Sequence, residues 1–399
     1  MSRADDLEAL TARLGPAAHR DAALGSRTTY RVGGRAALGV EVADENALLD
    51  VARALRGLDV PVLVMGNGSN LLVADAGFAG LVVTLGTGFE TLGITANEVR
   101  AGGALALPTL ARRTAAAGLT GLEWAVGVPG TVGGAVRMNA GGHGSDTVAT
   151  LVSYRVVDLV GAGVTDHPAS DLGATYRHTT VAATDVVVSA THRLEPGDPV
   201  AGRAAIDEIV RWRRANQPGG ANAGSVFTNP DDDSAGRLID HCGLKGLRIG
   251  TAEVSPKHAN FIQADRGGSA DDVRRVMDRV REAVAAETGV ELTSEVRMVG
   301  FDDWVEGVGP GGGSGSGPGD GSGAGSGPGG GSGSGPGDGS GAGSGSGDGS
   351  GSGPGDGSGA GSGDGSGSED GSGPGSGSGD GSGSGSGSGD GSGSGDGAP

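Results

Sequence analysis

The chain has 399 residues, 87 of them glycine, a formal net charge of −19 and a single cysteine. Ten acidic residues and no basic residue lie after Gly307, so residues 1–306 carry only −9. This moderate charge argues against nucleic acid as a partner, because phosphate binding needs clustered Lys and Arg. One cysteine excludes an internal disulfide framework. Without a signal-peptide core or an apolar run near the ~20 residues that span a bilayer, we expect a soluble cytoplasmic protein.

Helix and strand patterns alternate along the first 200 residues. Leu7, Leu10 and Leu14 are spaced as on one face of a helix that ends at Gly15. Asp44 is a favourable N-cap for the next helix. The remaining elements predicted in this part are strands at 37–42, 62–65, 80–85, 99–101, 151–159 and 185–194 and a helix at 108–118.

The following hundred residues favour helices. We predict a helix over 203–214, a helix capped by Ser234, and a long helix whose start, Ser269 with Asp272, resembles a capping box. The last predicted strand, 290–300, places Glu295 and Arg297 on its polar face. The chain is therefore predicted to be a mixed α/β protein.

Two glycine-rich segments stand out. Residues 121–142 hold glycines and a proline among small apolar residues, and an ordinary core helix is not expected there, because each interior Gly costs ~1 kcal/mol relative to Ala. The segment could be a backbone cradle for a phosphate or a tightly packed turn. A second loop, Gly66–Asn70, follows a predicted strand and favours the cradle.

Seven motifs, in this order and spacing, resemble the flavoprotein family UDP-N-acetylenolpyruvoylglucosamine reductase. They are Thr29-Tyr-Arg-Val-Gly-Gly34, Gly66-Asn-Gly-Ser-Asn-Leu71, Gly127-Val-Pro-Gly-Thr-Val-Gly-Gly134, Met138-Asn-Ala-Gly141, Tyr176-Arg177, Asn222-Ala-Gly-Ser225 and Lys257-His-Ala-Asn-Phe261. The resemblance covers about residues 24–300. Without an inserted loop between Tyr176 and Asn222, the chain resembles the shorter, type II-like subtype.

The resemblance implies the domain order. A helical segment (1–23) precedes a two-lobed FAD-binding domain of the PCMH-like type (24–196), a mixed α/β substrate-binding domain (197–303) and the tail (304–399). The implied reaction reduces UDP-N-acetylglucosamine enolpyruvate to UDP-N-acetylmuramate in peptidoglycan precursor synthesis. NADPH reduces FAD, and the reduced FAD passes a hydride to the enolpyruvyl group. We expect a monomer without a membrane partner.

The resemblance also assigns residues. Ser225 matches the proton donor, while Arg177 and Glu295 match the pair that stabilises the enolate-like intermediate. The implied FAD contacts are Gly66, Asn67, Gly68, Ser69, Asn70, Leu71, Gly127, Val128, Pro129, Gly130, Thr131, Gly133, Gly134, Asn139, Ala140 and Gly141. The implied substrate contacts are Tyr176, Arg213, Gln217, Asn229 and Lys257.

Each assignment has a plainer alternative. Ser225 could be an ordinary turn residue, Arg177 a surface ion-pair partner, and Glu295 a solvated carboxylate. Two positions depart from the family pattern: Thr228 replaces a common lysine, and His143 stands where tyrosine is usual. His192, His241, Cys242 and His258 have no metal-ligand spacing, and we expect no metal.

Two other functions stay open at this point. Another FAD oxidoreductase with the same flavin-binding fold, such as a carbohydrate oxidase, would share the glycine loops. A catalytically silent flavin or nucleotide-sugar binding protein would be expected to lack Ser225 or Glu295, and both are present.

The tail after Gly307 consists of Gly, Ser, Pro, Ala and acidic residues apart from Val308, so it cannot bury enough apolar surface to fold. This disordered tail could be a flexible spacer, a solubilising acidic brush or an interaction segment, and its composition favours the first two. Truncation after Asp303 is therefore expected to leave turnover unchanged, as steady-state assays of the full and shortened chains would show. A tenfold loss of activity would contradict this role.

Overall fold

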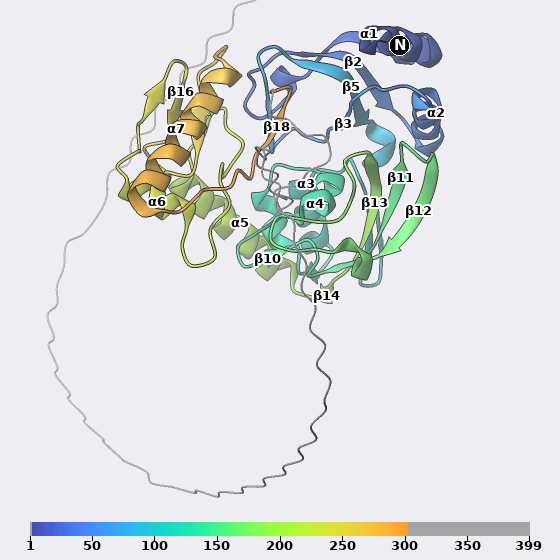
Figure 1. Ribbon diagram of the computed structural model, residues 1–399. Coiled ribbons are helices and arrows are strands. Elements are labelled where there is room, and N and C mark those ends of the chain that lie inside the picture. Colours follow the sequence, from blue (N-terminus) through green and yellow to red (C-terminus); the bar gives the residue numbers. More distant parts are fainter. Residues whose placement is uncertain (1, 302–399) are drawn as a thin grey trace, which may run out of the picture. The chain divides into compact units, whose positions relative to one another are not determined.

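The computed structural model describes residues 2–301, and the predicted disordered tail lies outside this range (Figure 1). Helices and strands alternate, which confirms the mixed α/β class. The helices are α1 (Arg3–Leu14), α2 (Glu45–Leu55), α3 (Leu107–Ala116), α4 (Val132–Met138), α5 (Pro199–Asn216), α6 (Ala235–His241) and α7 (Ala270–Thr288). Among these residues, no helix combines the length and apolar character that a bilayer crossing requires.

The first sheet has four strands in the order β1-β2-β5-β3. Its members are β1 (His19–Ala23), β2 (Arg35–Val42), β3 (Val62–Val64) and β5 (Phe78–Leu85). Both β2 and β3 run parallel to β5, as a strand-helix-strand crossover through α2 requires. Asp44 caps α2 as predicted, accepting a bond from the Ala47 amide at 2.9 Å. Leu48 and Val51 of this helix pack into the core beside the sheet.

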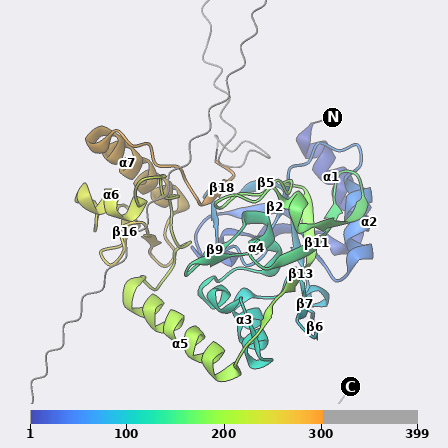
Figure 2. The ribbon, with the colours of Figure 1, turned by 90° about the horizontal axis from the view of Figure 1, so that it is seen from below.

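The second sheet has five antiparallel strands in the order β12-β11-β13-β7-β6. Its members are β6 (Leu92–Thr95), β7 (Glu98–Gly102), β11 (Leu151–Asp158), β12 (Gly163–Pro168) and β13 (Asp185–Arg193). Two short pairs lie outside it, β8 (Leu119–Thr120) with β14 (Glu195–Pro196), and β9 (Gly141–Gly142) with β10 (Ser145–Asp146). Figure 2 shows α3 and α4 beside this sheet.

The glycine-rich segment contains a helix that the sequence analysis did not expect. Helix α4 is only seven residues long and includes Gly133 and Gly134. A Cβ on Gly133 would lie 2.8 Å from the Val187 carbonyl oxygen of β13, so glycine is what lets α4 contact the sheet. Close packing at this position therefore outweighs the helix-propensity cost of glycine.

The C-terminal part has its own core. Strands β15 (Arg248–Ile249), β16 (Ala252–Val254) and β17 (Ile262–Ala264) form an antiparallel sheet, and α7 packs against it through Val273, Val276 and Val280. Ser234 and Ser269 cap α6 and α7 as predicted. The capping box at α7 is incomplete, because the Asp272 carboxylate accepts from Thr251 instead.

The chain's last strand returns to the first part of the protein. Strand β18 (Arg297–Val299) pairs in parallel with β4 (Leu71–Val73), directly after the Gly66–Asn70 loop. The prediction of a strand over 290–300 was too long, since only three residues form the ladder. The alternation nevertheless holds: Leu292 and Val296 are buried in the C-terminal core, while Glu295 and Arg297 face a cavity.

A second contact joins the same parts of the chain. The Asp75 carboxylate, just after β4, accepts bonds from the Ser269 hydroxyl and from the amides of Ala270 (2.9 Å) and Asp271 (3.3 Å) at the start of α7. The proposed domain limits at residues 24, 197 and 303 remain predictions. The contact itself shows that the N-terminal end of α7 depends on a residue far away in sequence.

We predict that Asp75→Ala lowers the free energy of unfolding by about 1–2 kcal/mol, because the first turn of α7 loses its acceptor and a favourable negative charge. Denaturant unfolding measures the change. Asp50→Ala, which removes an exposed ion pair with Arg53, is the matched control and should change stability by less than about 0.5 kcal/mol. Equal effects of the two substitutions would contradict the capping role.

Candidate active site

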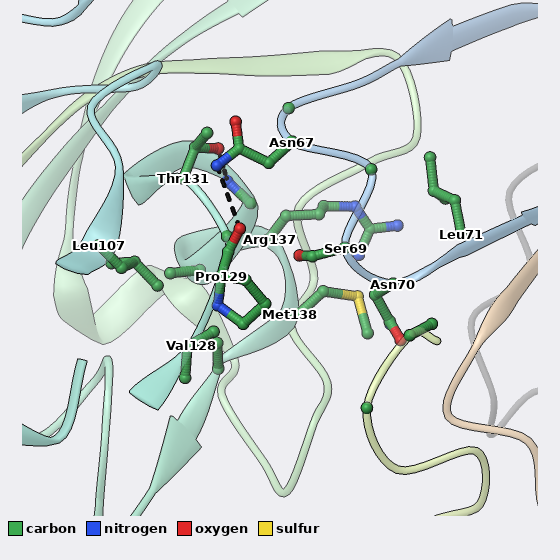
Figure 3. Close-up of a pocket in the computed structure, with 18 of the residues that line it drawn as sticks. Asn67, Ser69, Asn70, Leu71, Leu107, Val128, Pro129, Thr131, Arg137 and Met138 are labelled. Atoms are coloured by element: carbon green, nitrogen blue, oxygen red, sulfur yellow. Dashed lines mark hydrogen bonds between the residues drawn. The ribbon is translucent and has the colours of Figure 1, made fainter. Parts of the chain in front are cut away.

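A cavity of about 930 Å³ is lined by both glycine-rich loops and by residues of the C-terminal part. The Gly66–Leu71 segment forms one wall and the Gly127–Thr131 segment another (Figure 3). This volume lies near the upper end of the ~300–1,000 Å³ typical of ligand pockets, so it has room for a large cofactor or for parts of two ligands.

The two glycine loops are tied to each other. The Asn67 side-chain amide donates to the Pro129 carbonyl at 3.1 Å, the bond drawn dashed in Figure 3. At Gly66 a Cβ would lie 2.5 Å from the Thr131 hydroxyl, which is itself engaged in capping α4. Only bare backbone fits between the loops. This arrangement suits FAD, whose phosphates would be met by main-chain N–H groups.

Nearly all of the predicted FAD contacts line the cavity. The exception is Asn139, which is buried at the C-terminal end of α4. Its amide nitrogen donates to Asp146 and to the Thr175 carbonyl, each at 3.1 Å, and its oxygen accepts from the Val148 amide at 3.1 Å. These bonds fix the segment that leads into Tyr176 and Arg177, so Asn139 shapes the cavity without forming its wall.

Arg177 and Glu295 form an ion pair on the cavity wall. Arg177 Nε donates to Glu295 Oε1 at 3.0 Å, and Arg177 Nη2 donates to the Gly141 carbonyl at 2.8 Å. Arg177 adopts φ of 57°, unusual for a residue with a side chain, and its guanidinium lies 5.0 Å from the centroid of the Tyr176 ring. The sequence places these two residues 118 positions apart, and the fold brings them into direct contact.

Ser225 lies on the same cavity, half-buried, in a loop held by the C-terminal part. Next to it, the Val226 carbonyl accepts from the Glu295 amide at 2.8 Å. The buried Asn260 side chain binds both the amide (3.0 Å) and the carbonyl (2.8 Å) of Phe227. Asn260 is part of the Lys257–Phe261 motif, and these bonds explain why that motif accompanies the Ser225 loop.

The predicted substrate contacts divide into two groups. Tyr176, Arg213, Gln217 and Asn229 line the cavity. Lys257 lies off the wall, and its ammonium group donates to the Arg214 carbonyl at 2.6 Å. Of the two departures from the family pattern, His143 lines the cavity in edge contact with Trp212, whereas the Thr228 hydroxyl is turned to the Thr293 carbonyl at 3.3 Å.

Three further arginines on the cavity wall, the exposed Arg27 and the half-buried Arg137 and Arg297, were not assigned from the sequence. Arg137 is the one Lys, Arg, Asp or Glu between Glu123 and Asp146, and Arg297 follows Glu295 on the same strand face. A lone charge inside a small, apolar segment was the signal available for Arg137. For Arg297 the available signal was its spacing of two from Glu295, because side chains two residues apart on a strand lie on the same face.

The histidines do not gather with other ligand types. In the range 2–301, no group of three or more His, Cys, Asp or Glu side chains is arranged to hold a metal ion. His192 is buried against the Thr150 hydroxyl at 3.0 Å, and burial lowers its pKa to about 4. His258 lines the cavity and stacks edge-on with Phe261.

Comparison with known proteins finds two family models that match different parts of the chain. Residues 36–165 match a family model described as an FAD binding domain, and residues 216–299 match the C-terminal domain of UDP-N-acetylenolpyruvoylglucosamine reductase. The reductase 2 of this name from Symbiobacterium thermophilum is 42% identical over 279 residues, which is 69% of this chain and 90% of that one. The Rubrobacter xylanophilus reductase is 40% identical over 291 residues, which is 72% of this chain and 97% of that one.

The fold agrees with a solved structure of the same name. The crystal structure of the Thermus caldophilus UDP-N-acetylenolpyruvylglucosamine reductase aligns with a TM-score of 0.62 and 33% identity, covering 71% of this chain and 98% of that one. The motifs, the two matched domains and the near-complete coverage of these relatives lead to one conclusion: this chain belongs to the UDP-N-acetylenolpyruvoylglucosamine reductase family.

Proposed function

We propose that this protein is an NADPH-dependent flavoenzyme that reduces UDP-N-acetylglucosamine enolpyruvate to UDP-N-acetylmuramate for peptidoglycan synthesis. The proposal gives Ser225 the role of proton donor and gives Arg177 and Glu295 the role of stabilising the enolate. We also propose that the enzyme is a monomer and acts in the cytoplasm, where the nucleotide-linked precursors are made.

The observation that carries the proposal is the meeting of three segments on one cavity. The Arg177–Glu295 pair, the Ser225 loop and the two glycine loops all line it. A reaction that moves a hydride and a proton to neighbouring carbons needs a cofactor site and a proton-donating site within reach of one substrate. These groups come from distant parts of the chain, so their convergence is a property of the fold.

When bound, FAD supplies the hydride that reduces the double bond. The protein's own groups then stabilise the negative charge that develops on the substrate. Hydride addition to the terminal carbon builds negative charge on the next carbon and its carboxylate, which calls for fixed positive charge and hydrogen-bond donors. Arg177 has five N–H groups and uses two on Glu295 and Gly141, so donors remain for a substrate carboxylate.

Glu295 supports this role through its contact with Arg177. Burial raises the pKa of the Glu295 carboxyl above its ordinary value of 4.5, and the neighbouring Arg177 opposes this only in part. The Glu295 oxygen that accepts from Arg177 Nε at 3.0 Å fixes the guanidinium on the cavity wall. Arg177 and Glu295 would therefore act together, the cation being held in place by its carboxylate partner.

Ser225 is suited to the last step by position. Its loop is held at Val226 by Glu295 and at Phe227 by Asn260, so the backbone that carries the hydroxyl is fixed on the same cavity as the pair. A serine hydroxyl is a weak acid by itself. Its proton would be passed to the carbon as the enolate collapses and replaced through a neighbouring group or water.

The alternatives lose support at this point. A carbohydrate oxidase and a silent binding protein would each share the flavin loops, but neither requires the combination of Ser225, Arg177 and Glu295. The matches to named reductases also extend through residues 216–299, beyond the flavin-binding part.

We predict that Ser225→Ala still oxidises NADPH but reduces the enolpyruvyl sugar at least about 100-fold more slowly, since only the second half-reaction uses the proton. Stopped-flow measurement of flavin reduction and reoxidation separates the two steps. Ser189→Ala, on β13 away from the cavity wall, is the matched control and should leave both steps intact. Equal slowing of both steps in Ser225→Ala would remove the donor role.

The raised pKa of Glu295 predicts how the stability of the protein depends on pH. This raised pKa means that the folded protein keeps a proton that the unfolded chain releases near pH 4.5. The stability of the wild type relative to Glu295→Gln should therefore fall as pH rises above about 4.5, and level off above the pKa of the folded state. Denaturant unfolding of both proteins between pH 4 and 8 tests this, and a difference that grows with pH would contradict it.

A further inference from the structure

Of the three cavity arginines that the sequence did not assign, Arg137 and Arg297 are the two that are not exposed. Arg297 lies on β18, where its amide donates to the Asn70 carbonyl at 3.1 Å, and it faces the cavity two residues after Glu295. Arg137 lies in the last turn of α4 and, in the view of Figure 3, extends between the loop of Val128 and Pro129 and the segment of Ser69 and Leu71. Both side chains are half-buried.

Neither guanidinium has a bonded partner in the part of the chain that the structure describes. Within residues 2–301, neither Arg137 nor Arg297 donates a side-chain hydrogen bond or forms an ion pair, whereas Arg177 is paired with Glu295 and Arg213 is bonded to Gln217. They are also close enough to repel each other. Burial and then the charge of Arg297 lower the pKa of Arg137 to about 10, although Asp185 partly offsets this. Burial likewise lowers the pKa of Arg297.

Two half-buried like charges, with only the partial offset from Asp185 among the described residues, oppose folding. The pairing of β18 with β4 fixes the backbone of Arg297, so its side chain leaves the cavity wall from a defined position. A pair of cations kept in such a place points to a negatively charged ligand group. Arg297 follows Glu295 by two residues, which puts that group at the end of the cavity where the Arg177–Glu295 pair lies.

We propose that Arg137 and Arg297 form a cationic pair that holds the negative charge acquired by the FAD ring when it is reduced, and so favours the reduced cofactor. The inference rests on the proposed function for the identity of the cofactor. Hydride transfer from NADPH gives the neutral ring two electrons and one proton, forms NADP⁺, and leaves one net negative charge on the ring. The pair neutralises this charge without taking part in bond making.

Positive charge therefore has two different roles in this cavity. Arg177, paired with Glu295, is set for the substrate, while Arg137 and Arg297 are set for the cofactor. The oxidised ring has no net charge and gains less from the pair. The reduced form should consequently bind more tightly than the oxidised form, which is the condition for a raised reduction potential.

The test is the reduction potential of bound FAD, measured against a reference dye without any sugar substrate. Arg137→Met and Arg297→Met should each lower the preference for reduced over oxidised FAD by about tenfold, which for two electrons is about 30 mV. Arg112→Met, which removes an exposed arginine of α3 bonded only to the Pro108 carbonyl, is the control and should leave the potential unchanged. Unchanged potentials in both cavity variants would overturn the proposal.

A second readout distinguishes this role from a structural one. Without FAD, both Met variants should melt at a higher temperature than the wild type, because an unneutralised buried charge has been removed. A lower melting temperature for both variants without FAD would contradict a binding role for the pair. Arg137→Lys and Arg297→Lys retain the charge and should recover most of the potential, which keeps the test decisive if a Met variant folds poorly.

The outcomes also separate this inference from the proposed function. Shifted potentials in a protein that fails to reduce the UDP enolpyruvyl sugar would support the cationic pair and reject the proposed substrate. Normal sugar reduction with unshifted potentials would support the proposed function and reject the cationic pair. A wild-type protein that binds no FAD would overturn both.

Discussion

The parallel pairing of β18 with β4 is the contact on which the candidate site depends. Three residues at the end of the described chain add a strand directly after the Gly66–Asn70 loop, and the Asn70 side chain donates to the Glu295 carbonyl at 2.9 Å. A parallel pair requires a long connection. Here that connection is the second sheet and the whole C-terminal part, so Glu295 and Arg297 reach the glycine loop only when all of these are folded.

Charge in the cavity is distributed unevenly for a physical reason. A half-buried ion pair such as Arg177–Glu295 offsets much of its own desolvation cost and keeps a defined geometry. Arg137 and Arg297 have no such partner among the described residues and remain available to a ligand. Binding sites often retain such unfavourable features, because the interactions that stabilise a ligand are incomplete until it arrives.

Two asparagines show how motif residues can act at a distance from the chemistry. Asn139 makes three hydrogen bonds that hold the approach to Arg177, and Asn260 makes two that hold the loop after Ser225. Both are buried, where an unsatisfied amide or carbonyl would be costly. The motifs that contain these asparagines are therefore explained by the positions they impose on neighbouring residues.

The sequence by itself determined the mixed α/β class, the capped starts of α2, α6 and α7, and the family, because caps, periodicity and ordered motifs are local signals. It also indicated the glycine loops as bare backbone, since glycine has few other uses in such runs. Tertiary structure decided that α4 is a helix, because only the contact of Gly133 with β13 offsets its propensity. It alone paired Arg177 with Glu295, removed Asn139 and Lys257 from the cavity wall, and left Arg137 and Arg297 without a bonded partner among residues 2–301. These facts depend on which distant segments meet, and no local pattern of residues encodes that.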